Sequence, residues 1–500
     1  MFNWLQSKKK KKAQTSKPAP TLSGLFDTLS GSSDFLHFTF ETDGKSCQVT
    51  YIKTLVNPDF IHTHILSPLS KKDFRNLEDI GELLPIENIV ITDCVEEIQN
   101  KIMSGHIFIQ MKEKDRKGVL ISAVANETRQ VTTPEVEFSV VGPKEAFVES
   151  LDTNINLIRK RLPLPQLQVK EVRVGKISKT RVVVLYIDGI ANQENINTVM
   201  QRIQDLEYDQ ISDSSFITQM IADNSNSPFP QFVDTERPDR VTSVLSEGKI
   251  AIIVDGSPHA FTVPITLVEF FSAFEDYFLP WHIASSFRLI RLGAVMFSVL
   301  STPLYVAVLT YHYEMIPTRL LATLVSSRAA IPFPPIIEAV ILELTIELLR
   351  EAGARLPTKV GQTIGIVGGI VIGTASVQAG LTSNVLLIII ALAALASFTT
   401  PIYQMSNTIR LIRFPFLLFA QLWGIIGVSM CFSFFLAHLL KLTSIGRPYL
   451  APIYPLRIKD LRDALFRLPF SWQAKRPIQM RPEDSARFDK GRALAKKDNK

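Results

Sequence analysis

Two long stretches of this 500-residue chain carry almost no ionisable side chain. Residues 360–409 contain no Asp, Glu, Lys, Arg or His, and residues 414–440 contain only His438. Apolar runs of about 18 residues or more are typical of membrane-spanning helices. The sequence therefore excludes a wholly soluble protein and also a disordered or fibrous one, although its charged fraction of 20% is close to the soluble average of about 25%.

The positive charge of the chain is gathered at its two ends. Residues 1–20 carry six Lys and no acid, and residues 441–500 carry 15 Lys plus Arg against six acids. This distribution differs from the basic stripe of a nucleic-acid-binding domain, so we expect no nucleic-acid partner. The Lys run at 8–12 suits either a solvated arm or contact with anionic membrane lipid.

The segments before the apolar stretches predict soluble domains. Period-2 runs predict strands, and 3.6-residue periodicity predicts helices at 96–102, 152–161 and 195–206. The strands are expected at 35–40, 47–52, 106–111, 119–124, 182–187 and 249–254. We expect an α+β or α/β cytosolic region of two subdomains, followed by an all-α polytopic membrane domain. The predicted parts are a basic flexible arm at 1–30, an α+β subdomain at 31–141, a second α/β subdomain at 142–284, a transmembrane domain at 285–445 and a basic cytosolic tail at 446–500.

Hydropathy predicts four membrane spans. They are 292–311, two spans within 360–409 that are broken near 380–384, and 414–440. An even number of spans leaves the N-terminal region and the C-terminal tail on one side, and the positive-inside rule makes that side the cytoplasm. No signal peptide precedes these segments, because no apolar core follows Met1–Lys12.

The segment 334–350 is apolar and helical in period but contains Glu338, Glu343 and Glu347. Such a helix is amphipathic, re-entrant or buried against other helices. Ionisable residues at membrane depth are functional candidates, and a ring of carboxylates from several subunits would concentrate cations. The alternative is structural, with Glu347 paired to Arg350 and Glu351 paired to Arg355.

A stripe of small residues follows at helical spacing. Every fourth residue is glycine, and the stripe continues in Ser376, so that its members are Gly361, Gly365, Gly369, Gly373 and Ser376. On a membrane helix, small residues allow close contact between helices. They also suit a pore wall, where short side chains leave room for water and ions. Both interpretations remain open at this point.

The sequence offers no enzyme signature. It has no phosphate loop, dinucleotide fingerprint or nucleophile elbow. Cys47, Cys94 and Cys431 are too scattered to predict a disulfide framework or a metal knuckle. We therefore expect no catalytic residue, no metal and no cofactor.

Residues 140–455 contain several ordered motifs. The motif NSPFPQ at 226–231 is followed by TERPD at 235–239, and the other motifs are GPK at 142–144, DTN at 152–154, GKIAIIVDGSP at 248–258, IPFPP at 331–335, TIELLREAG at 345–353, GQTIG at 361–365 and ALASFT at 394–399. In this order they resemble the GerA family of spore germination proteins. Similar motifs occur in the SpoVAF-type accessory proteins of the same family, which remains an alternative.

The resemblance implies the A subunit of a nutrient germinant receptor in the spore inner membrane, with both termini in the spore core. Its partners would be a transporter-like B subunit and a lipoprotein C subunit. It also implies a homo-oligomeric ring, a pentamer, that conducts cations. The rival hypotheses are a nutrient transporter component, for which four spans are few, and a scaffold whose spans only anchor it.

Overall fold

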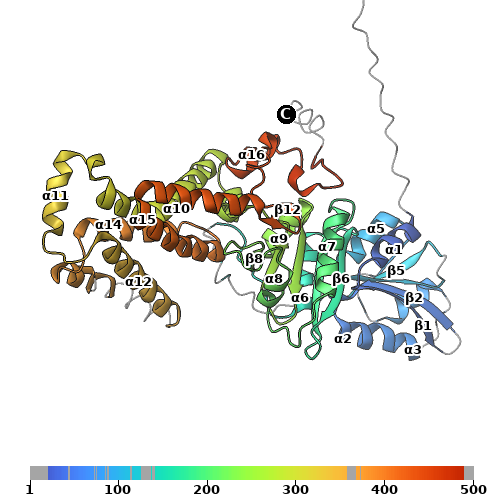
Figure 1. The fold of residues 1–500 in the computed structure, drawn as a ribbon. Coiled ribbons are helices and arrows are strands. Elements are labelled where there is room, and N and C mark those ends of the chain that lie inside the picture. The colour runs from blue at the N-terminus through green and yellow to red at the C-terminus, as the bar shows by residue number, and fades with distance from the viewer. Residues whose placement is uncertain are drawn as a thin grey trace, which may run out of the picture. The chain divides into compact units, whose positions relative to one another are not determined.

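A computed structural model describes residues 21–488 except 43–44, 72–73, 75, 85, 87–88, 113–114, 126–133, 135–136, 138–140, 357–367 and 372. The chain folds as two compact units (Figure 1). The first unit takes in residues 1–129 and 155–171, and the second takes in 130–154 and 172–500. The boundary passes through α6 (Leu151–Arg161) and β6 (Leu167–Val174). The five-part division expected from the sequence stays a prediction.

The first unit is an antiparallel sheet with helices on both faces. Its strand order is β1-β2-β4-β5-β3, with β1 at Phe35–Thr42, β2 at Lys45–Ile52, β3 at Val90–Thr92, β4 at His106–Gln110 and β5 at Gly118–Ser122. Successive side chains of a strand point to opposite faces. Phe108 therefore packs in the cluster of α1 and α5, while Ile107 and Ile109 pack in the cluster of α2 to α4.

The helices of the first unit are short. They are α1 (Leu22–Ser30), η1 (Lys53–Leu55), α2 (Pro58–Phe60), η2 (Ile61–Leu66), α3 (Ser67–Lys71), α4 (Leu77–Leu83) and α5 (Val95–Ile102). A buried ion pair supports this unit from α6, because Arg159 Nε lies 2.6 Å from Asp34 Oδ2. The predicted strands of this unit and the predicted helix at 96–102 are confirmed.

The second unit contains the other antiparallel sheet. Its order is β6-β7-β9-β10-β8, with β7 at Thr180–Ile187, β8 at Val233–Thr235, β9 at Ile250–Val254 and β10 at Ala260–Val263. Its helices are α7 (Gln193–Gln204), α8 (Ser214–Ile221) and α9 (Pro238–Ser246). Every strand residue of β9 is buried, as its uninterrupted apolar sequence predicts. Two short helices, η3 (Leu267–Phe271) and η4 (Phe274–Tyr277), lead to the membrane helices.

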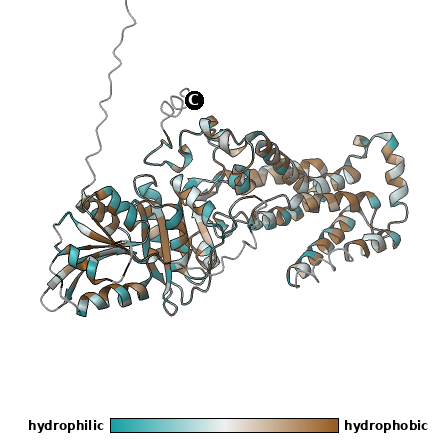
Figure 2. Cartoon of the chain, turned by 180° about the vertical axis from the view of Figure 1, so that it is seen from behind, coloured by the Kyte–Doolittle hydropathy of each residue, from teal (hydrophilic) through white to brown (hydrophobic). Residues whose placement is uncertain are grey.

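The helical part of this unit contains two helices that are long and apolar enough to cross a membrane among the residues described. They are α10 (Trp281–Tyr311) and α15 (Tyr403–Lys441). Between them lie η5 (Tyr313–Met315), α11 (Thr318–Arg328), α12 (Pro335–Ala354) and α14 (Asn384–Ser397). Hydrophobic colour runs along these helices in Figure 2, whereas in the sheets it is concentrated in the strands. The prediction of a mixed α/β region followed by helices is confirmed.

Helix α15 is a hairpin rather than one rod. Trp423 and Gly424 have non-helical backbone angles, and Gly424 has a φ of +58°. The rings of Phe416 and Phe435 lie 5.7 Å apart, although 19 residues of continuous helix would separate them by about 28 Å. The chain therefore reverses at Trp423–Gly424, and its two legs, residues 403–422 and 425–441, pack side by side.

The hairpin corrects one of the predicted spans. The prediction of a single span at 414–440 is wrong, because the chain turns back in the middle of it. Of the two spans expected within 360–409, the first lies partly outside the described residues, and the second is not confirmed as one helix, because α14 ends at Ser397 and α15 begins at Tyr403. The predicted span 292–311 falls within α10, which begins earlier, at Trp281. Four spans are therefore not confirmed.

The chain after α15 folds back onto the second sheet as far as residue 488. It contains β11 (Thr443–Ser444), β12 (Arg447–Pro448), α16 (Ile458–Ala464), η6 (Phe470–Trp472) and η7 (Ile478–Met480). Arg447 fixes it to α7, with its Nε 2.8 Å from Asn195 Oδ1 and its Nη2 2.7 Å from Glu194 Oε2.

The hairpin makes a prediction about two glycines. A Cβ at Gly427 would lie 1.9 Å from the Phe419 carbonyl oxygen on the facing leg, whereas no atom lies within 4 Å of a Cβ at Gly293 in α10. Gly427→Ala should therefore destabilise the purified chain by about 1–3 kcal/mol, because the legs must separate. Gly293→Ala is the control and should leave the melting temperature unchanged or raised. Equal melting temperatures for the two variants would contradict the hairpin.

Candidate functional site

A buried ion pair joins three helices in the apolar part of the second unit. Glu343 of α12 pairs with Arg413 of the first leg of α15, and both side chains are almost fully buried. Two hydroxyls of α10 complete the cluster: Thr302 Oγ1 donates to Glu343 at 3.1 Å, and Arg413 Nη2 donates to Ser298 Oγ at 2.7 Å. The carboxylate and the guanidinium thus neutralise one another where neither could remain alone.

Glu338 lies one and a half turns earlier on α12 and is also buried. Its Oε1 lies 2.9 Å from Arg328 Nη2 of α11, and its Oε2 accepts from the backbone N–H of Ser383 at 3.2 Å. Glu338 therefore ties α12 to α11 and to the start of α14. Its charge, like that of Glu343, is matched within the same chain.

The third carboxylate is paired at the far end of α12. Glu347 pairs with Arg350, and Arg410 Nε of α15 lies 3.8 Å away from it. Glu351 pairs with Arg355 at 2.5 Å on the exposed surface. These are the two pairs that the structural alternative expected. The sequence patterns did not indicate that Arg410 and Arg413 are partners of these carboxylates. The two arginines lie between the apolar stretches at an i, i+3 spacing, which places them on one helix face, as the i, i+4 spacing does for Glu343 and Glu347.

The small-residue stripe is described only in part. Gly361 and Gly365 lie outside the described residues, whereas Gly369, Gly373 and Ser376 lie in helical segments at 368–371 and 373–378. Apart from its own helix, no described residue has an atom within 4 Å of a Cβ built on Gly369, and the nearest described atom to a Cβ on Gly373 is Leu387 Cδ2 at 3.7 Å. Neither glycine is therefore required by a tight contact with the described residues of its own chain.

A loop before β8 connects the sheet with the hairpin. This junction loop, residues 224–232, contacts both legs of α15 near their ends. Thr408 Oγ1 donates to the Pro228 carbonyl at 2.6 Å, and Ser227 Oγ lies 2.8 Å from His438 Nε2. Phe229 packs against His438 with 5.9 Å between ring centroids. The sequence signal was the NSPFPQ motif, which alone did not indicate these contacts.

The tail after α15 binds the same loop. Ser444 Oγ donates to the Gln231 carbonyl at 2.8 Å, and Tyr449 Oη donates to the Pro230 carbonyl at 2.7 Å. The loop is closed on itself by Gln231, whose Nε2 donates to the Asn224 carbonyl at 2.6 Å. The junction loop is thus held by the sheet, by both legs of the hairpin and by the tail.

An acidic group follows the junction loop on β8. The Oδ1 atom of Asp234 is buried without a hydrogen-bond partner and lies 3.5 Å from His259 Nδ1. Burial raises the pKa of Asp234 to about 6, His259 opposes that rise, and the neighbouring carboxylates of Asp213, Glu236 and Glu137 add to it. Among the described residues, no group of three or more His, Cys, Asp or Glu could hold a metal ion.

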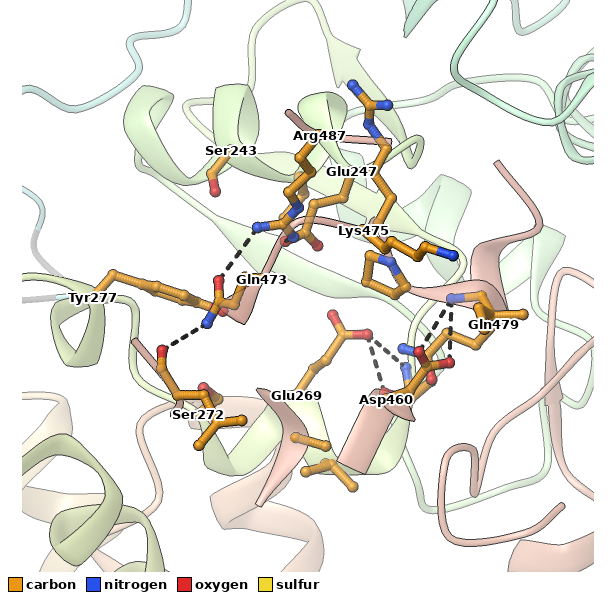
Figure 3. Close-up of a pocket in the computed structure, with 18 of the residues that line it drawn as sticks. Ser243, Glu247, Glu269, Ser272, Tyr277, Asp460, Gln473, Lys475, Gln479 and Arg487 are labelled. Carbon is orange, nitrogen blue, oxygen red and sulfur yellow. Dashed lines mark hydrogen bonds and ion pairs between the residues drawn. The ribbon is translucent and has the colours of Figure 1, made fainter. Parts of the chain in front are cut away.

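A cavity of about 390 Å³ lies between α9, η3, η4 and the tail (Figure 3). Its acids are already engaged: Glu247 Oε1 lies 2.6 Å from Arg487 Nη2, and Glu269 pairs with Lys249 and accepts from Thr266 Oγ1 at 3.0 Å. The tail forms one wall of the cavity, where Gln473 Nε2 donates to the Leu468 carbonyl at 3.0 Å. The charges that line the cavity largely compensate one another.

Together these features define a class: two antiparallel α+β units, with the second carrying membrane-type helices held by buried ion pairs. The family model described as "Bacillus/Clostridium GerA spore germination protein" matches residues 23–479. The chain belongs to the GerA family of spore germination proteins.

Known proteins similar to this chain bear related names. It is 52% identical over 469 residues to the spore germination protein GerQA of Bacillus cereus, covering 94% of each chain. It is 47% identical over 472 residues to GerIA of Bacillus cereus, covering 94% of this chain and 71% of that one. The crystal structure of the N-terminal domain of the A subunit of the Bacillus megaterium spore germinant receptor GerK3 is 27% identical, with 49% of this chain and 92% of that chain covered and a TM-score of 0.37. None of the three is named as an enzyme.

The ion pair of Glu343 makes a prediction that differs from that of a cation-concentrating ring. Glu343→Gln leaves the buried Arg413 charge without a carboxylate, so we expect the subunit to lose about 3–5 kcal/mol of stability. Glu351→Gln, in the exposed pair with Arg355, should cost less than about 1 kcal/mol. Thermal unfolding in detergent measures both. Removing both charges, as Glu343→Leu with Arg413→Leu, should restore much of the loss, and failure of this double variant to do better than Glu343→Gln would contradict the pairing.

Asp234 predicts a pH dependence of stability. Its folded pKa of about 6 lies above the ordinary value of 3.8, so the folded protein keeps this proton where the unfolded chain releases it. The stabilisation that comes from this retained proton is complete below the ordinary pKa of 3.8 and is lost as the pH rises through about 6. Asp234→Asn should therefore raise the melting temperature at pH about 7 and change it little at pH about 4. The exposed Asp209→Asn is the control, and an equal gain at both pH values would contradict the shift.

Proposed function

We propose that this chain is the A subunit of a nutrient germinant receptor and forms a homo-oligomeric, nutrient-gated cation channel, a pentamer, in the spore inner membrane. The observation that carries the proposal is membership of the GerA family over almost the whole chain. It is supported by the spore germination proteins GerQA and GerIA of Bacillus cereus, which are 52% and 47% identical to this chain over 94% of its length. Its partners would be the transporter-like B subunit and the lipoprotein C subunit.

The geometry favours the small-residue stripe over the carboxylates as the wall of the cation path. Glu338, Glu343 and Glu347 each have an arginine partner within the chain, so they leave little net negative charge to attract a cation. Gly369 and Gly373 of the stripe have no tight contact with the residues of the subunit that the structure describes. In a ring of subunits, such a surface would face either a neighbouring subunit or the central path.

The membrane topology of the proposal places both ends of the chain in the spore core. α10 leaves the second sheet through η4, and α15 returns to that sheet after reversing at Gly424. A path that leaves and re-enters the same soluble unit crosses the membrane an even number of times. This path supports the even number of spans expected from the sequence.

The channel is tested by adding bulk to the stripe. Gly369→Leu should lower nutrient-dependent cation conductance of the reconstituted receptor roughly tenfold, because an apolar ring narrows or dewets the path. The mass of the purified complex should not change, because the site is open within the subunit. Val371→Leu, about 200° round the same helix, is the matched control.

Each contrary outcome has a meaning. Normal conductance of Gly369→Leu with normal assembly would remove the stripe from the path. Loss of the assembled complex would assign Gly369 to a subunit contact. Uptake of a labelled amino acid by vesicles that contain this chain alone would favour the transporter alternative.

A further inference from the structure

The tail after α15 carries an exposed aromatic and aliphatic surface that its own chain does not cover. Trp472 is 64% exposed and Phe470 is 58% exposed, although large apolar side chains normally avoid water. Further exposed residues of the same segment are Ile453, Tyr454, Leu456, Ile458 and Phe466. We call residues 453–475 the tail collar. An apolar surface of this size marks a contact with another molecule or with lipid.

The tail collar is fixed at the start of the membrane helix α10. Ser285 Oγ of α10 donates to the Arg467 carbonyl at 3.1 Å. The Arg467 guanidinium in turn donates to the carbonyls of Leu279 and Tyr277, at 3.1 and 3.2 Å, just before α10 begins. In Figure 1, α16 lies beside the first turns of α10. The collar is therefore held at the depth where α10 leaves the soluble fold.

The first turns of α10 are themselves apolar and exposed. Trp281, Phe287 and Ile290 all have exposed side chains, as do Tyr311 and Trp423 at the other end of the helices. Tyr311 Oη donates to the Gln421 carbonyl at 2.8 Å, so those two aromatic residues share one end. Aromatic residues at both ends of membrane helices are typical of the two lipid interfaces. The collar continues the aromatic girdle at the end nearer the sheet.

The charge of the tail collar also suits a membrane surface. Residues 453–475 contain Arg457, Lys459, Arg462, Arg467 and Lys475 against Asp460 and Asp463. Arg457 and Lys475 have no carboxylate partner within the described part of the chain. Basic residues beside an apolar surface are attracted to anionic headgroups.

From these observations we propose that the tail collar is an in-plane membrane anchor, with Phe466, Phe470 and Trp472 inserted among lipid headgroups and Arg457 and Lys475 at anionic phosphates. This inference does not depend on the proposed channel function. It assigns the surface to lipid rather than to a protein partner, because the collar is continuous with the girdle of α10 and carries a net positive charge.

Tryptophan fluorescence of the full chain tests the anchor. The natural tryptophans are Trp4, Trp281, Trp423 and Trp472, so W4F, W281F and W423F together leave Trp472 as the one reporter. The chain is reconstituted in vesicles of phosphatidylglycerol and phosphatidylcholine whose acyl chains carry bromine, a quencher, either near the headgroup or deep in the bilayer. Bromine near the headgroup should lower Trp472 emission roughly twofold, and deep bromine should lower it less.

The control reporter lies on the exposed surface of the same unit. Y208W in a background without the four natural tryptophans places an exposed indole outside the membrane helices, near Phe216 of α8. It should not be quenched by either lipid. Equal quenching at positions 208 and 472, or none at 472, would overturn the anchor. Trp472 shielded from bromine and also from an aqueous quencher would show that a protein covers the collar, which likewise overturns it.

A second variant covers the case in which the tryptophan replacements do not fold. S471C with C94S, which removes the exposed natural cysteine, keeps all four tryptophans and carries a nitroxide label between Phe470 and Trp472. In vesicles the label should be more accessible to oxygen, which partitions into lipid, than to a polar nickel complex. The reverse order would overturn the proposal. R457Q with K475Q should weaken the preference of the collar for phosphatidylglycerol over phosphatidylcholine, and an unchanged preference would remove these two residues from it.

Discussion

The packing of the membrane helices depends on one buried ion pair, between Glu343 and Arg413. Isolated, either charge would be very costly in an apolar surrounding. Together they bring α12 and α15 to α10, where Ser298 and Thr302 accept and donate the remaining hydrogen bonds. A pair of this kind stabilises little relative to apolar residues of the same size. Its value is geometric, because it joins α12 to α15, and the hydroxyls of Ser298 and Thr302 join both charges to α10.

The soluble folds could be predicted well from the sequence, because their signals are local. Strands such as β7 and β9 are uninterrupted apolar runs bounded by turns, and α7 shows its buried face as a repeat. The membrane region could be recognised but not traced. Hydropathy detects that residues 414–440 are apolar, but it contains no information on direction, so a reversal at Gly424 is invisible to it. The positive φ of that glycine is the only local sign of the turn.

The carboxylates show a different limit. Glu338, Glu343 and Glu347 were recognised as unusual, but most of their partners lie on other helices: Arg328 on α11, and Arg413 and Arg410 on α15. Only the Glu347–Arg350 pair is local enough to be expected from spacing along one helix. The junction loop was likewise recognised as a motif, while its contacts with Thr408 and His438 depend on how α15 folds back. Pairs of residues that lie this far apart in the chain cannot be recognised from any single window of sequence.

The attachment of both hairpin legs to one loop has a mechanical consequence. Thr408 and His438 lie thirty residues apart, yet both are bound within the junction loop, while the far ends of the legs meet at Trp423–Gly424. The two legs therefore form one lever that is held at the junction loop. A small rotation of the loop swings the tip at Trp423 through an arc set by the length of the legs, about 30 Å for 20 helical residues. The edge strand β8, which begins directly after the loop, is the part of the sheet through which such a rotation would be transmitted.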